Sequence, residues 1–159
     1  VSVEFPATAQ CGPLVADLRT HASTPTALEL ATPPATMLIR FESVETVAVE
    51  QAEQAATLAR GHGGTVVVLA GEDETVAWRE HDARVFDREG TIVKLVVVPS
   101  KVSSTLAWLD DAAKRRQLDY VATGLPRAGD VVGGERYLDD ASAWSFSLVG
   151  VIPLAPLAP

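Results

Sequence analysis

The chain has 159 residues, of which 47% are hydrophobic and 21% are charged, and its formal charge is −8. This length fits one domain with a substantial core, and the composition excludes a disordered chain. The acidic balance argues against binding nucleic acid or anionic lipid, because those surfaces need clustered lysine and arginine. Cys11 is the single cysteine, so the sequence excludes an internal disulfide and a cysteine-based metal site.

Two further features concern where the protein works. No apolar run reaches the length of a membrane span and no signal peptide is visible, so we expect a cytoplasmic protein without a membrane span. The first residue is Val1 rather than methionine, so we expect a fragment or a processed product of a longer chain.

The first third of the chain predicts a strand, a helix and a second strand. Residues 1–6 alternate apolar and polar side chains, which is typical of a half-buried strand. Gly12 and Pro13 open a helix, because proline is favoured in the first turn. Residues 27–31 form the next predicted strand, and residues 32–34 form a turn.

Residues 35–70 predict a β-α-β unit, around which we expect the rest of the chain to be organised. The apolar runs 36–41 and 65–69 suit strands that are buried on both faces. Between them, residues 43–60 carry apolar side chains at helical spacing, and Ser43 is a plausible N-cap. Gly61 follows where a left-handed C-cap is favoured.

The second half repeats the alternation of helices and strands. We expect a helix at 74–87, a strong strand at 92–98, an amphipathic helix from Val102, a weaker strand at 119–123 and a last strand at 145–152. Residues 124–136 are rich in glycine and predict a loop. The order predicts an α+β, ferredoxin-like domain over 1–152, followed by a proline-rich tail at 153–159. Its antiparallel sheet would carry helices on one face, with two βαββαβ halves as one arrangement.

The sequence carries no strong catalytic or metal-binding motif. Residues 129–134 lack the features of a phosphate-binding loop and of a dinucleotide fingerprint. His21 and His62 are isolated, and we expect both at the surface rather than in a metal site. We therefore predict no metal ligand and no catalytic residue.

Five residues remain as candidates for contact with a ligand. Trp78, Arg79 and His81 share one predicted helix and are able to line a pocket for a small acid. The alternative is that Trp78 packs in the core while Arg79 and His81 face water. Arg40 and Lys94 interrupt apolar strands, so they point at a ligand on an open sheet face or occupy solvated edge positions.

Four further segments are informative when taken together: ALEL at 27–30, MLIRFES at 37–43, WREH at 78–81 and IVKLVVVPS at 92–100. In this order and spacing they resemble the C-terminal half of the FAD-binding subunit of bacterial glycolate oxidase, which implies that Arg40, Trp78, Arg79 and Lys94 are positions that meet the substrate or flavin. That subunit is similar to flavoproteins of the vanillyl-alcohol-oxidase and p-cresol-methylhydroxylase type, and the resemblance covers residues 1–152. It implies a cap, or substrate, domain with an antiparallel sheet and ferredoxin-like connections.

The resemblance further implies a parent enzyme that oxidises a small 2-hydroxy acid such as glycolate with FAD. Its partners would be the FAD-binding domain of the same parent protein and other oxidase subunits, including an iron-sulfur subunit. The FAD-binding domain is absent from this chain, and residues 120–124 lack the histidine of relatives. We therefore expect this chain alone to be inactive. The alternative is a ferredoxin-like module, with a homodimer formed through its sheet, that binds a ligand or protein without catalysis.

Overall fold

The computed structural model describes residues 1–21, 25–86, 91–97, 101–116, 121–127 and 145–152. The last three strands are described by their backbone pairing. The proline-rich tail predicted at 153–159 and most of the predicted loop at 124–136 lie outside the described residues.

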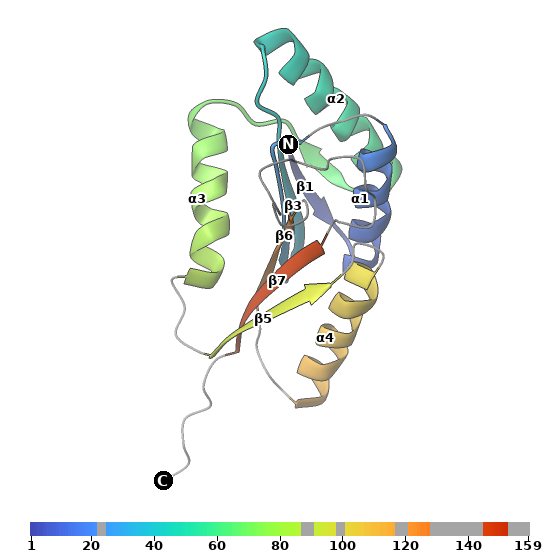
Figure 1. Cartoon of the computed structure of the whole chain (residues 1–159), viewed down its shortest axis with the longest axis vertical. Helices are drawn as coiled ribbons and strands as arrows, with labels where there is room; N and C mark the ends of the chain where they lie inside the picture. The colour runs from blue at the N-terminus through green and yellow to red at the C-terminus, as the bar shows by residue number, and fades with distance from the viewer. Residues whose placement is uncertain (22–24, 87–90, 98–100, 117–120, 128–144, 153–159) are drawn as a thin grey trace, which may run out of the picture.

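The first 67 residues form a complete βαββαβ unit (Figure 1). Its elements are β1 (Ser2–Phe5), the short 3-10 helix η1 (Thr8–Gln10), α1 (Cys11–Thr20), β2 (Ala27–Thr32), β3 (Ala35–Arg40), α2 (Glu45–Gly61) and β4 (Thr65–Val67). The strands pair in the order β4-β1-β3-β2, and every pair is antiparallel. This order is that of a ferredoxin-like fold.

The second half continues the same sheet. After α3 (Glu72–Phe86) come β5 (Thr91–Val97), α4 (Val102–Arg116), β6 (Val121–Arg127) and β7 (Ser145–Ile152). Its strands pair as β6-β7-β5, which repeats the β2-β3-β1 order of the first half. The halves join where β2 pairs with β6, Leu30 lying opposite Gly124. The predicted α+β class and the antiparallel sheet with ferredoxin-like connections are therefore confirmed.

The helices divide unequally between the two sheet faces. Figure 1 shows α1, α2 and α4 on one side of the sheet and α3 on the other. Three helices share one face, as the sequence predicts, but α3 lies over part of the face expected to be open. Helix α3, which connects the two halves in the chain, therefore also covers part of this second face of the sheet.

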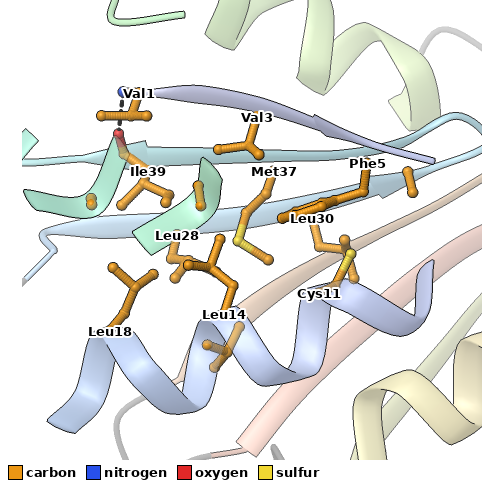
Figure 2. Close-up of a cluster of buried hydrophobic side chains, with 14 of the residues drawn as sticks. Val1, Val3, Phe5, Cys11, Leu14, Leu18, Leu28, Leu30, Met37 and Ile39 are labelled. Carbon is orange, nitrogen blue, oxygen red and sulfur yellow. Dashed lines mark hydrogen bonds between the residues drawn. The ribbon is translucent and has the colours of Figure 1, made fainter. Parts of the chain in front are cut away.

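The core lies between the first three strands and the helices α1 and α2. Alternate side chains of β1, β2 and β3 point into it, and Val3, Leu30 and Ile39 are each at most 1% exposed. In Figure 2, Leu14 and Leu18 of α1 reach toward these strands. Alanines at 55, 56 and 59 are fully buried, and their small side chains let α2 pack close to the sheet.

Three predicted details around α2 differ in the structure. The N-cap is Val44, which makes no side-chain capping hydrogen bond, rather than Ser43. The left-handed residue after the helix is Gly63, with φ +80°, whereas Gly61 is still helical. Strand β4 spans three residues, and Val67 is 54% exposed rather than buried. The prediction of a doubly buried strand at 65–69 is wrong because β4 is the edge of the sheet, paired with β1 on one side.

The contact between α1 and α4 holds the two halves together at Gly12. The Gly12 N–H donates a hydrogen bond to Ser103 Oγ at 3.1 Å, and the Ser103 hydroxyl donates to the Ala9 carbonyl at 3.2 Å. A Cβ atom on Gly12 would lie 2.4 Å from that Oγ. A side chain at this position would therefore force the Ser103 hydroxyl to turn away from its two hydrogen-bond partners.

We expect Gly12→Ala to lower the free energy of unfolding by about 1–3 kcal/mol, because the added methyl displaces Ser103. Adding Ser103→Ala removes the obstructing oxygen and leaves the Ser103 Cβ 3.5 Å from the new methyl. The double variant should thus recover part of the loss, which urea unfolding of all four proteins measures as a coupling energy. Additive effects would contradict the contact.

Burial raises the pKa of the Cys11 thiol to about 12. The thiol is therefore neutral at pH 8, where the thiolate is the reactive form. We expect native Cys11 to react with an aromatic disulfide reagent at least about 100-fold more slowly than in the urea-unfolded chain. Equal rates in the native and unfolded protein would show that α1 does not pack as described.

Candidate functional site

The face of the sheet under α3 carries polar side chains at the positions that alternate with the core. On β2 and β3, Leu28 and Ile39 are opposite each other on the core side, and the next pair, Glu29 and Leu38, faces α3. Arg40 follows two residues after Leu38 and therefore shares this face. The strand alternation thus places a carboxylate and a guanidinium beneath one helix.

Arg40 meets two side chains of α3. Its Nε donates a hydrogen bond to Glu74 Oε1 at 2.7 Å, and its Cζ lies 4.5 Å from the centre of the Trp78 ring. The side chains of Arg40 and Glu74 are each 32% exposed. Within the described part of the chain, Nε is the one guanidinium nitrogen of Arg40 with a hydrogen-bond partner. Its terminal nitrogens are therefore able to bind an anion.

His81 lies one turn further along α3 and is 4% exposed. Its Nε2 is 2.7 Å from Glu29 Oε2, although the carboxylate oxygen is out of line for a hydrogen bond. Its ring stands beside Trp78, with the ring centres 6.2 Å apart and the planes 59° apart. A buried imidazole requires a polar partner, and Glu29 is that partner here.

A third polar contact fastens the C-terminal part of the helix. Arg84 Nη1 donates a hydrogen bond to Thr36 Oγ1 on β3 at 3.3 Å. Three contacts therefore run along α3 at Glu74, His81 and Arg84, each to β2 or β3. We call the group of Arg40, Glu74, Trp78, His81 and Glu29 the α3 cluster.

The structure brings three of the five candidate residues together. Arg40, Trp78 and His81 belong to the α3 cluster, whereas Arg79 is exposed on the outside of α3. Lys94 is on β5, where it pairs with Val149 of β7. Strand β5 is four strands away from β3 in the sheet order, which corresponds to a distance of about 19 Å between the two strands. The side chain of Lys94 lies outside the described residues.

The alternative in which His81 faces water is wrong, because α3 turns it toward the sheet. Sequence reasoning missed Glu29 and Glu74 as members of the site. Glu29 is the one charged residue in the strand at 27–32. A charge inside an apolar strand is the same feature that singled out Arg40 and Lys94, so it could have singled out Glu29 as well. Glu74 stands among three acidic residues in the first turn of α3, where the helix dipole alone explains an acid. Its partner could not be inferred without the fold.

The other histidines form no site in the described part of the chain. His62 Nε2 contacts Asp17 Oδ2 at 2.7 Å and joins the ends of α2 and α1, and His21 is exposed. No group of three metal-ligating side chains occurs among the described residues. No helix in that part of the chain has the length and apolarity needed to cross a membrane.

No protein-family model matches the chain, and no curated protein matches it.

Proposed function

We propose that this chain is the cap, or substrate, domain of an FAD-linked oxidoreductase that acts on a small 2-hydroxy acid such as glycolate. The observation that carries the proposal is Arg40, held over Trp78 with its terminal nitrogens unpaired in the described structure. A guanidinium presented in this way binds a carboxylate through two parallel hydrogen bonds. The sequence resemblance and the ferredoxin-like connections support the same conclusion.

The role of the chain is to bind and orient the acid. Arg40 would hold the carboxylate, and the Trp78 ring restricts the guanidinium to one orientation. Glu29 and His81 fix α3 over the sheet, so the two parts of the site stay together. When bound, FAD would supply the acceptor for the hydride of the 2-hydroxy acid.

The described residues fit a substrate carboxylate better than they fit FAD itself. The α3 cluster offers one guanidinium and two carboxylates, whereas dinucleotide phosphates require several N–H donors or cations. We therefore assign FAD mainly to a separate FAD-binding domain of the parent protein. An iron-sulfur subunit would be a further partner in the assembled oxidase.

One observation favours a second function, a binding module without catalysis. Strand β4 ends the sheet with a free edge in the described structure, and Val67 and Val68 beside it are 54% and 43% exposed. Such an edge is able to pair with a second copy of the chain or with a strand of another protein. In that case the α3 cluster would serve only to hold the helix.

An absorption spectrum of the full-length gene product, purified without added cofactor, tests the proposal. We expect flavin bands in the visible blue region that bleach when glycolate or lactate is added without oxygen. A colourless protein that also fails to take up added FAD would contradict the oxidase function and favour the binding module.

A further inference from the structure

Arg40 is paired within the α3 cluster with a carboxylate, the same chemical group that we propose it binds in the ligand. Glu74 presents a carboxylate to Arg40 Nε at 2.7 Å, at a place where both side chains are about one-third exposed. A small carboxylate that approaches the guanidinium would meet this negative charge at close range. In a partly buried site two like charges repel more strongly than they do in water.

The first turn of helix α3 is attached in a way that allows it to move. None of the helix's described side chains belongs to the hydrophobic core cluster, and His81 is the only one of them that is buried. Among the described residues, its side-chain hydrogen bonds and ion pairs with the strands are those at Glu74, His81 and Arg84, and the helix also packs against β6 and β7. Of these polar contacts, only the one at Glu74 belongs to the first turn of α3, and the terminal turn of a helix opens more easily than its interior.

The start of α3 provides a place where the helix can pivot. Gly71 precedes the helix with φ +61°, and it is exposed. Its carbonyl accepts hydrogen bonds from the Thr75 N–H and hydroxyl. Glu74 therefore lies within one turn of a glycine with unusual backbone freedom, while His81 and Glu29 anchor the helix further along.

From these observations we infer that Glu74 is an internal competitor for Arg40, which a small 2-hydroxy acid displaces when it binds. The inference rests on the proposed function, because it concerns the regulation of that same carboxylate site. In the free protein Glu74 neutralises Arg40 and holds the first turn of α3 against β3. In the bound protein the ligand carboxylate binds the terminal nitrogens of Arg40, and its charge repels Glu74 from Nε. The first turn then moves away while the pair of His81 and Glu29 remains.

The test compares the affinity for sodium glycolate in four proteins by isothermal titration calorimetry. Glu74→Gln removes the competing charge and keeps the shape of the side chain, so we expect glycolate to bind about tenfold more tightly. Glu72→Gln is the matched control, since it removes the same charge from an exposed side chain in the same turn. Its affinity should stay within about twofold of the wild type.

Hydrogen exchange gives a second readout on the wild-type protein. Saturating glycolate should speed amide exchange at residues 72–78 and leave exchange around His81 unchanged. If Glu74→Gln binds glycolate no more tightly than Glu72→Gln does, or if exchange at 72–78 slows, the inference is wrong.

Arg40→Gln distinguishes a failure of the Glu74 competition from a failure of the carboxylate site itself. If this variant loses glycolate binding while Glu74→Gln binds glycolate no more tightly than the wild type, the carboxylate site is supported. Only the inference that Glu74 competes with the ligand is then wrong. If the wild type and Arg40→Gln bind glycolate equally, or neither binds it, the proposed site fails and the inference fails with it.

Discussion

Replacing Arg40 with glutamine is expected to weaken binding of a 2-hydroxy acid by about 10- to 100-fold, because hydrogen bonds between charged groups contribute about 1.5–3 kcal/mol each. Glutamine retains a polar side chain but lacks the charge and the two parallel donors of the guanidinium. The measurement is the dissociation constant for glycolate or, in the flavin-loaded parent enzyme, kcat/KM.

The control for this prediction is Arg79→Gln. Arg79 is on the same helix, but it is exposed and makes no hydrogen bond or ion pair with the α3 cluster in the described structure. It should change the affinity by less than about twofold. Circular dichroism verifies that Arg40→Gln remains folded, since it also loses the contacts to Glu74 and Trp78. Equal effects of the two substitutions would show that the chain attracts the acid by general charge and not at Arg40.

Replacing Leu30 with alanine is expected to lower the free energy of unfolding by about 2–5 kcal/mol. Leu30 is 1% exposed, and it pairs with Met37 on β3 and with Gly124 on β6. Truncation therefore leaves a cavity in the strand that joins the two halves of the sheet. Urea unfolding monitored by circular dichroism measures the loss.

Val49→Ala is the matched control for Leu30→Ala. Val49 is 58% exposed on α2, so removing its branched side chain should change the stability by less than about 0.5 kcal/mol. If Leu30→Ala costs no more than this control does, Leu30 does not lie in the core, and the packing of β2 against the helices would be contradicted.

Hydrophobic patterning was sufficient to place most of the elements. The strand predicted at 36–41 is β3 at Ala35–Arg40, and the helix predicted at 74–87 is α3 at Glu72–Phe86. Both are local patterns of alternation or helical spacing, which the tertiary structure retains. The strand order also follows from the sequence of elements, because short connections join neighbouring strands and helices cross between separated ones.

Strand β6 shows where the patterning failed. Residues 124–127, which include Pro126, fall within the loop predicted from the glycine content of 124–136, yet they pair with β7 from Leu148 to Ser145. Beyond Gly124 the strand no longer pairs with β2, and proline is tolerated where a strand has a neighbour on one side only. The pairing is long-range, so no local rule predicts it.

The candidate site was predictable only in part, for the same reason. A charge inside an apolar strand singled out Arg40, and the mixture of an aromatic and charged residues singled out Trp78 and His81. The register of β2 against β3 and the docking of α3 decide which of these residues meet. That arrangement shows that Arg40 and His81 each have a carboxylate partner, Glu74 and Glu29.

The measurement that tests the central claim most directly is an NMR titration of the protein with glycolate and with its neutral analogue, glycolamide. Trp108 is 58% exposed on α4 and serves as an internal reference. The claim predicts that the Arg40 Nε–H and Trp78 indole resonances move saturably with glycolate and stay in place with glycolamide, while that of Trp108 does not move. Shifts that are equal for the two compounds, or absent at Arg40 and Trp78, would contradict a carboxylate site in the α3 cluster.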